Sequence, residues 1–144
     1  MSAMDYSGPD RRRGGSDRKA LDEITRILVV DDHALFRMGI ANILGQQPDF
    51  EIVAEAEDSR SAIDRALETS PDVILMDLSL PSPGGIETTS RIKRELPSTA
   101  IIVLAQTEDE DALFDAIKAG AAAFILKDVG PDDLVTIIRR VVAG

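Results

Sequence analysis

Apolar residues in this chain gather in five short runs, each followed by a longer stretch in which apolar residues recur with a helical period. Most of the runs are nearly continuous, which is typical of strands that are buried on both faces of a sheet. The runs predict strands over residues 26–30, 51–56, 72–76, 100–105 and 122–126. The stretches between and after them predict helices over residues 33–46, 59–69, 86–96, 107–120 and from residue 131 onward.

Capping residues indicate where several of these helices begin. Asp58 or Ser59 can cap the second helix, because a short polar side chain there can accept a free backbone N–H. Thr107 and Glu110 have the spacing of a capping box, so we expect Thr107 to cap the fourth helix. Pro131 suits the first turn of the last helix, where its missing N–H costs nothing.

Regular alternation of strands and helices predicts an α/β fold, a single doubly wound (βα)5 domain with helices on both faces of a parallel sheet. The length of 144 residues suits one domain. Aromatic residues make up only 3% of the chain, so its core must be mainly aliphatic. Residues 1–24 are rich in charge, Gly, Pro and Ser, and we expect a disordered leader there and the folded domain over residues 25–144.

Charge and composition exclude several functions. The net charge is −10, and residues 1–25 hold five basic and five acidic side chains, so the rest of the chain carries all of it. Such an acidic domain repels a phosphate backbone, so we expect no direct binding to nucleic acid. The chain has no Cys, and no apolar stretch approaches the roughly 20 residues of a membrane span. We therefore expect a cytoplasmic protein that does not contact a membrane.

Charged residues follow three of the predicted strands. Asp31 and Asp32 follow the first strand, Asp77 follows the third, and Lys127 follows the fifth. In a doubly wound sheet of order 2-1-3-4-5 these strands end at the same edge, where such folds bind ligands. Clustered carboxylates raise one another's pKa unless a cation compensates them, and Mg²⁺ prefers oxygen ligands. The pattern therefore indicates a Mg²⁺ site in which Asp77 can accept a phosphoryl group and Lys127 can neutralise its oxygens. We expect a structural role for His33, the only histidine.

Three stretches, ILVVDDH, VILMDLSLPSPGGIE and AGAAAFILKD, resemble the receiver domain of two-component response regulators. The resemblance covers residues 26–143. VDDH together with LKD is most similar to the subfamily with a C-terminal LuxR-type helix-turn-helix DNA-binding domain. The resemblance implies the flavodoxin-like receiver fold, with sheet order 2-1-3-4-5.

The resemblance also implies a role for each residue of the site. Asp77 would accept phosphate from the histidine of a sensor histidine kinase, and Lys127 would bind a phosphoryl oxygen. Asp32 would ligate Mg²⁺ directly and Asp31 through water, with Asp77 and the backbone carbonyl of Ser79 as further ligands. Mn²⁺ could replace Mg²⁺.

The sequence departs from the family at Ala105, where the spacing from Lys127 places Ser or Thr. In the family this hydroxyl contacts the phosphoryl group, and an aromatic residue, here Phe124, responds to it. The departure leaves the phosphorylation site intact but puts the conformational readout in doubt. One alternative is therefore a pseudo-receiver, a binding module whose switching is weakened or independent of phosphate.

Two other readings are weaker. A phosphatase of the haloacid dehalogenase type needs a second Asp two residues after the nucleophile, and Ser79 occupies that position. A flavodoxin-like FMN site is disfavoured because Asp31 and Asp32 would repel the phosphate. We therefore expect a signalling domain and not an enzyme, with chemistry limited to its own phosphorylation and dephosphorylation at Asp77.

The remaining expectations concern partners. A homodimer or partner surface is predicted on the face formed by the fourth helix, the fifth strand and the fifth helix. We expect Phe114 to lie beside the sheet-facing stripe of the fourth helix, which would comprise Leu113, Ala116, Ile117 and Gly120. The sequence stops soon after the fifth helix, which favours a fragment of a longer regulator over a stand-alone receiver.

Overall fold

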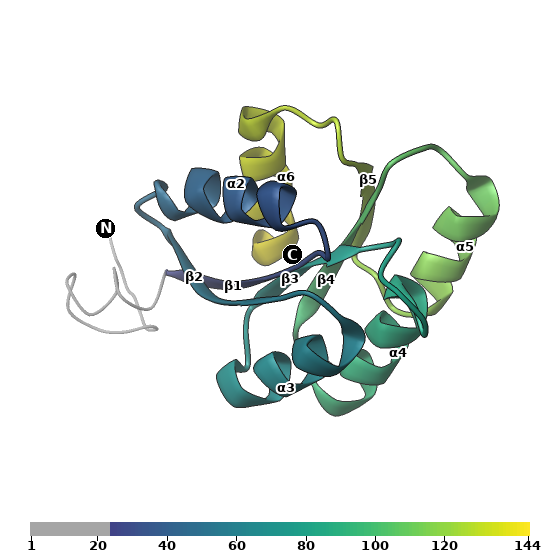
Figure 1. The fold of residues 1–144 in the computed structure, drawn as a ribbon. Coiled ribbons are helices and arrows are strands. Elements are labelled where there is room, and N and C mark those ends of the chain that lie inside the picture. Colours follow the sequence, from purple (N-terminus) through teal and green to yellow (C-terminus); the bar gives the residue numbers. More distant parts are fainter. Residues whose placement is uncertain (1–23) are drawn as a thin grey trace.

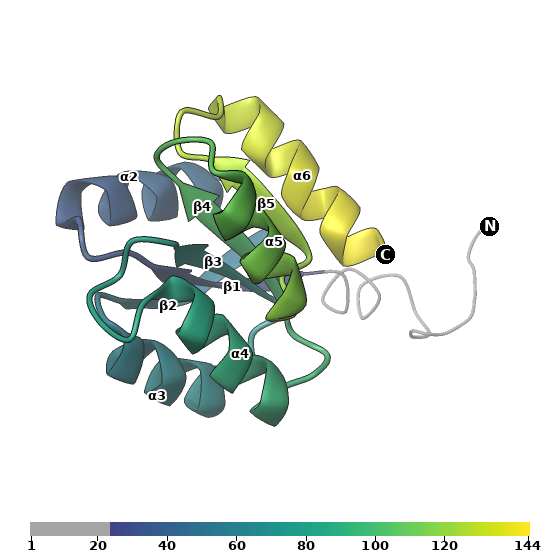
Figure 2. The same cartoon turned by 90° about the vertical axis from the view of Figure 1, so that its right-hand side faces the viewer.

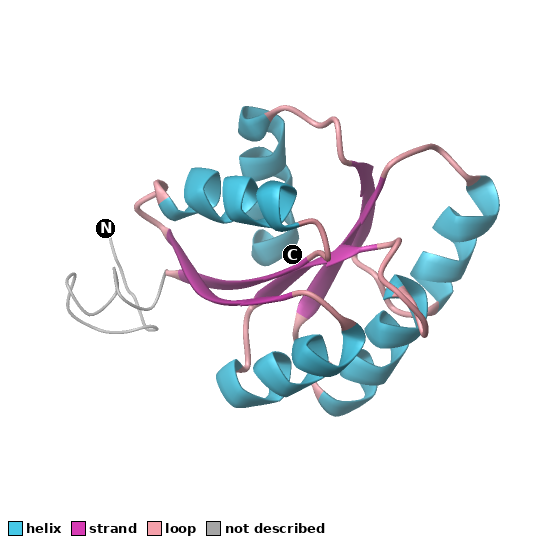
Figure 3. Cartoon of the chain, in the orientation of Figure 1, coloured by secondary structure: helices cyan, strands magenta, loops and turns pink. Residues whose placement is uncertain are grey.

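The computed structural model describes residues 24–144, so nearly all of the predicted leader lies outside the described residues. The strands are β1 (Thr25–Val30), β2 (Phe50–Ala56), β3 (Val73–Asp77), β4 (Ala100–Ala105) and β5 (Ala123–Leu126). The helices are α2 (Ala34–Gly45), α3 (Ser59–Thr69), α4 (Gly85–Glu95), α5 (Glu110–Lys118) and α6 (Pro131–Ala143). Strands and helices alternate along the chain, as Figure 3 shows and as the sequence predicts.

The five strands form one parallel sheet of order β2-β1-β3-β4-β5, which confirms the predicted topology. Helices α2 and α6 cover one face of the sheet, and α3, α4 and α5 cover the other (Figures 1 and 2). No helix in this part of the chain has both the length and the apolar character needed to cross a bilayer.

Burial of β1 explains its continuous apolar run. Ile27 and Val29 belong to the core beneath α2 and α6, whereas Leu28 and Val30 belong to the core beneath α3, α4 and α5. All four side chains are at most 1% exposed. Successive side chains of a strand point to opposite faces, so a strand covered on both sides must be apolar at every position.

Two of the predicted helix starts are confirmed. Asp58 caps α3, and its carboxylate accepts a hydrogen bond from the Ser61 backbone N–H at 2.8 Å. The Ser61 hydroxyl accepts the Asp58 N–H in return, which completes a reciprocal capping box. Pro131 is the first residue of α6.

The predicted cap of the fourth helix is wrong. The helix α5 begins at Glu110, and Asp109 caps it by accepting the backbone N–H groups of Asp111 at 3.0 Å and Ala112 at 3.2 Å. Thr107 lies before the helix and is exposed. The carboxylate of Asp109 also interacts favourably with the helix dipole, an advantage that a Thr hydroxyl lacks.

The predicted sheet-facing stripe of this helix is right at Ala116 and wrong at Leu113, Ile117 and Gly120. Leu113 is 39% exposed and Ile117 is 57% exposed, while Ala116 is fully buried. The inward face instead carries the small residues Ala112, Ala116 and Ala119, which are the buried or half-buried positions of this segment. Small side chains let a helix approach its neighbours closely. Because the alanines of α5 face inward, its larger apolar residues face outward. Phe114, which was expected to lie beside this stripe, is 65% exposed.

Candidate functional site

The predicted convergence of charged residues at one edge of the sheet is confirmed. Asp31 follows β1, Lys127 follows β5, and Asp77 is the last residue of β3, one residue later than the predicted strand end. The Lys127 Nζ lies 2.7 Å from Asp31 Oδ2 and 3.2 Å from Asp77 Oδ1. Because β4 separates β3 from β5, the long Lys127 side chain spans the end of β4 to reach both carboxylates.

Burial and neighbouring charges shift the pKa values of Asp77 and Lys127. Asp77 is fully buried and Asp31 is 1% exposed. Burial raises the pKa of Asp77 above its ordinary value, and the nearby Asp31 charge adds to this, although the Ser79 N–H that donates to Oδ1 at 3.0 Å lowers it in part. Burial alone would lower the pKa of Lys127, but the carboxylates of Asp31 and Asp77 raise it, so Lys127 remains an ammonium ion.

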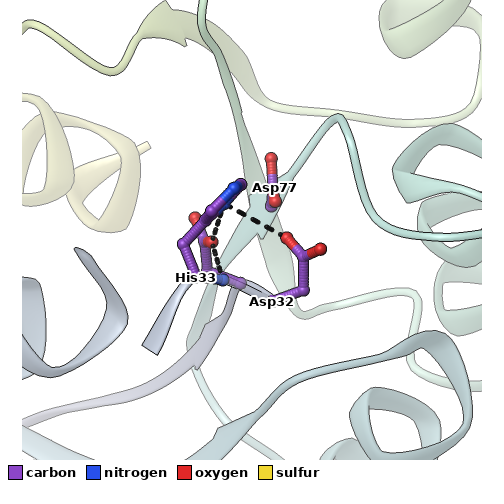
Figure 4. Close-up of side chains that lie close together, drawn as sticks. Asp32, His33 and Asp77 are labelled. Atoms are coloured by element: carbon purple, nitrogen blue, oxygen red, sulfur yellow. Dashed lines mark hydrogen bonds and ion pairs between the residues drawn. The ribbon is translucent and has the colours of Figure 1, made fainter. Parts of the chain in front are cut away.

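Asp32 and His33 complete the cluster at its more exposed side. The His33 Nδ1 lies 3.2 Å from Asp31 Oδ1. It also lies 3.2 Å from Asp32 Oδ1, and a dashed line marks this ion pair in Figure 4. One ligand atom from each of Asp31, Asp32, His33 and Asp77 falls within 4.8 Å of all the others. The sequence therefore predicted the three carboxylates of this group, but it did not identify His33 as a fourth member.

Two side chains of α2, those of Arg37 and Phe36, contact residues of this cluster. Arg37 donates from Nη1 to the backbone oxygen of Asp31 at 2.7 Å and from Nε to Glu55 Oε1 at 3.0 Å. The Lys127 Nζ lies 4.7 Å from the centre of the Phe36 ring, a cation–π contact. Sequence reasoning missed both residues, because a helical pattern does not reveal which neighbouring group each side chain meets.

Gly85 fixes the path of the loop that follows Asp77. The helix α4 begins at Gly85, whose N–H donates to the Leu78 carbonyl at 3.3 Å. A Cβ at this position would overlap the Asp77 backbone oxygen and lie 2.9 Å from the Leu78 Cα. Only glycine therefore allows α4 to start this close to β3. The metal-binding role of the Ser79 carbonyl stays a prediction.

Ala105 and Phe124 lie on the two strands between Asp77 and the α5 side of the molecule. Ala105 ends β4, is 1% exposed, and accepts the Lys127 backbone N–H at 2.7 Å. Phe124 pairs with Val103 across β4 and β5, is half-buried, and packs against the core beneath α3, α4 and α5. Their predicted switch roles stay predictions.

Comparison with known proteins identifies the family. The family model of the response regulator receiver domain matches residues 27–139 of the chain. The chain belongs to this family. The transcriptional regulatory protein LiaR of Bacillus subtilis is 43% identical over 119 residues, which cover 83% of this chain and 56% of LiaR.

Solved structures of receiver domains are similar throughout the fold. A two-component response regulator of the LuxR family from Aurantimonas sp. SI85-9A1 matches with a TM-score of 0.80 and 36% identity, over 84% of this chain and 86% of that chain. The response regulator domain of Thermotoga maritima CheB matches with a TM-score of 0.75 and 32% identity, over 84% of this chain and 98% of that domain. Both matches confirm the family, and the Aurantimonas match supports the LuxR-type subfamily that the sequence motifs predicted.

The receiver domain is therefore a signalling module of a two-component response regulator. The chain spans about half the length of the curated relatives it matches.

Proposed function

We propose that this receiver domain accepts a phosphoryl group on Asp77 from the phosphohistidine of a sensor histidine kinase. The observation that carries the proposal is the buried carboxylate of Asp77 beside the Lys127 ammonium. Its Oδ1 is held by the Ser79 N–H and by Lys127, whereas its Oδ2 is buried and accepts no hydrogen bond from the described part of the chain. The carboxylate of Asp77 therefore keeps one buried oxygen without a hydrogen-bond donor among the described residues.

The transfer would form one bond and break another. One carboxylate oxygen of Asp77 would attack phosphorus, the P–N bond to the kinase imidazole would break, and its electron pair would leave with the imidazole nitrogen. The Lys127 ammonium, 3.2 Å from Asp77 Oδ1, is placed to neutralise charge on a phosphoryl oxygen. Loss of the phosphoryl group to water would return Asp77 to its starting state.

The donors at this site fit Mg²⁺. Three carboxylates face one ammonium, which leaves negative charge to be compensated, and oxygen donors suit this ion. Asp32, Asp77 and the Ser79 carbonyl would hold it directly, and Asp31 would hold it through water, because its Oδ2 is already engaged by Lys127. Mn²⁺ has similar ligand preferences and could substitute. When bound, the ion supplies charge neutralisation for the phosphoryl oxygens.

The pseudo-receiver alternative rests on Ala105 alone. The domain keeps the buried Asp77, both acidic residues after β1 and Lys127, which are the groups that the proposed transfer would use. We therefore favour phosphorylation-dependent signalling, in which Ala105 and Phe124 modulate the response.

The wider context of the domain is part of the same proposal. We infer that residues 25–144 form the receiver of a longer cytoplasmic regulator whose further domain binds DNA, since relatives of about twice this length are transcriptional regulators.

Leu113, Phe114 and Ile117 expose apolar surface on α5 and would form part of a homodimer interface. Sedimentation of Phe114→Asp tests this, because an unchanged association state in a folded variant would argue against such an interface.

The phosphoacceptor is tested by measuring intact mass after incubation with acetyl phosphate and Mg²⁺. We expect the mass of one added phosphoryl group, which is lost in acid and is absent when a chelator removes the metal. Asp77→Asn should abolish the added mass, whereas Asp64→Asn, which changes an exposed Asp on α3, should leave it unchanged. Full labelling of Asp77→Asn would refute the assignment.

A further inference from the structure

The imidazole of His33 occupies a position that the proposed Mg²⁺ chemistry does not use. Its Nδ1 lies 3.2 Å from a carboxylate oxygen of Asp31 and 3.2 Å from one of Asp32 (Figure 4). Metal–ligand bonds of about 2.0–2.2 Å separate adjacent ligand atoms of a tetrahedral or octahedral site by roughly 2.8–3.6 Å. The His33 nitrogen and the Asp32 oxygen therefore already have the spacing of two ligands that share one ion, and Asp31, which would reach the ion through water, lies beside them.

A second observation points to a cation at the same place. Asp77 is fully buried, its Oδ2 accepts no hydrogen bond from the described residues, and its carboxylate belongs to the same 4.8 Å group as His33. A buried carboxylate oxygen without a donor is costly unless a positive charge approaches it. The cluster thus combines an unpartnered buried oxygen with an imidazole nitrogen at ligand spacing.

The His33 backbone already performs a structural task at this position, and the ring contacts the carboxylates in addition. The His33 N–H donates to Asp31 Oδ1 at 2.8 Å, which ties the start of α2 to the acidic pair. His33 is the N-cap residue of α2, yet its side chain makes no capping hydrogen bond. The ring is 56% exposed, so its orientation comes from the Nδ1 contacts with the two carboxylates and not from packing. A neutral imidazole with its proton on Nε2 presents a lone pair at Nδ1.

We propose that His33 is a nitrogen ligand that lets this centre bind late first-row divalent ions, such as Co²⁺ and Zn²⁺, with an affinity that carboxylates alone do not give. Imidazole is a good ligand for these ions, whereas Mg²⁺ prefers oxygen and gains little from it. His33 therefore sets the metal preference of the site. The inference rests on the metal centre of the proposed function, to which it adds one ligand and a selectivity.

The composition of the chain makes this inference easy to test. The full sequence contains one histidine and no cysteine. In untagged protein, any side-chain imidazole signal that responds to a transition metal therefore comes from His33, and no thiolate site competes for the ion. Two variants separate ligation from hydrogen bonding. His33→Ala removes the ring, and His33→Gln keeps an N–H donor for the carboxylates but offers no imidazole nitrogen.

The experiment titrates untagged wild type, His33→Ala and His33→Gln with Co²⁺ and, separately, with Mg²⁺ by calorimetry. Absorption in the cobalt d–d region and paramagnetically shifted ring signals in proton NMR give independent readouts of nitrogen ligation. We expect both variants to lose at least about tenfold in Co²⁺ affinity, while Mg²⁺ affinity changes by less than about twofold. The shifted ring signals should be present only in wild type.

Several results would overturn the inference. Equal Co²⁺ affinity in wild type and both variants would show that the ring is not a ligand, and so would full Co²⁺ affinity in His33→Gln alone. A loss of Mg²⁺ affinity as large as the loss of Co²⁺ affinity would refute selectivity. Failure of the proposed function has a different signature, because wild type would then bind no Mg²⁺, while the Co²⁺ titrations would still decide the role of His33. Thermal unfolding of both variants checks that the fold is intact.

Discussion

At the scale of single residues, Gly85 shows how closely the helix α4 approaches the strand that carries Asp77. A side chain there would overlap the Asp77 backbone oxygen, so Gly85→Ala must displace either the loop or the strand end. We expect it to lower the free energy of unfolding by about 1–3 kcal/mol, the usual cost of overpacking, and to slow phosphorylation. Urea unfolding and the mass assay measure these two effects.

The matched control is Gly39→Ala. Gly39 is exposed within α2, and a Cβ at this position would meet nothing within 4 Å. Replacing glycine by alanine in an open helical position should raise the free energy of unfolding by about 0.5–1 kcal/mol. If both substitutions changed stability equally, the close approach of Gly85 to β3 would not be what constrains this position.

Sequence reasoning identified site residues where a charge interrupts a buried pattern. Asp31, Asp77 and Lys127 could be placed because each stands at the end of an apolar strand, and parallel strands deliver such ends to one edge. His33 and Arg37 could not be placed in the same way. Their roles depend on the rotation of α2 about its axis and on which oxygens that rotation presents to them, and neither is encoded in spacing along the chain.

At the scale of elements, the start of α5 depends on one carboxylate. The Asp109 side chain accepts two of the free N–H groups at the first turn of this helix. We expect Asp109→Ala to lower the free energy of unfolding by about 0.5–2 kcal/mol, because those donors lose their partner. Thr107→Ala should change it by less than about 0.5 kcal/mol, since Thr107 is exposed and lies before the helix. Chemical unfolding compares the two, and a larger cost for Thr107→Ala would restore the capping box inferred from sequence.

Elements were predicted well where both sides of the chain are constrained. The strand over residues 100–105 and the helix over residues 59–69 have the bounds that the apolar pattern predicted. The rotation of α5 about its axis was not predicted, because β5 lies at the edge of the sheet and offers α5 less surface to cover. At such an edge, close packing of alanines outweighed burial of the larger Leu113 and Ile117.

At the scale of the whole molecule, the sheet connects two distant features. The charged cluster lies at the C-terminal edge of the strands. The exposed apolar residues of α5 lie on the face of the sheet that α3, α4 and α5 cover, and Phe124 packs against the core on this face. The strands β4 and β5 join the two through Ala105, whose carbonyl accepts the Lys127 N–H, and through Phe124. Phosphorylation of Asp77, as proposed above, would therefore have a short route to α5 if the new phosphoryl group contacts a residue of β4.

That contact is where Ala105 matters, and its replacement gives the final prediction. A phosphoryl group shifts a conformational equilibrium only by its different interactions with the two states, and a hydroxyl at position 105 would supply one of them. A hydrogen bond to a charged group contributes about 1.5–3 kcal/mol, which corresponds to a roughly 10- to 150-fold shift in population. We expect Ala105→Thr to enlarge the phosphorylation-dependent amide shifts of β5 and α5 in NMR spectra recorded with acetyl phosphate and Mg²⁺. Ala105→Val is the matched control, because valine has nearly the shape of threonine without the hydroxyl, and it should not enlarge them. An equal effect of valine would attribute the change to packing around this buried position. A wild-type response that threonine does not increase would show that another group performs the task of the hydroxyl.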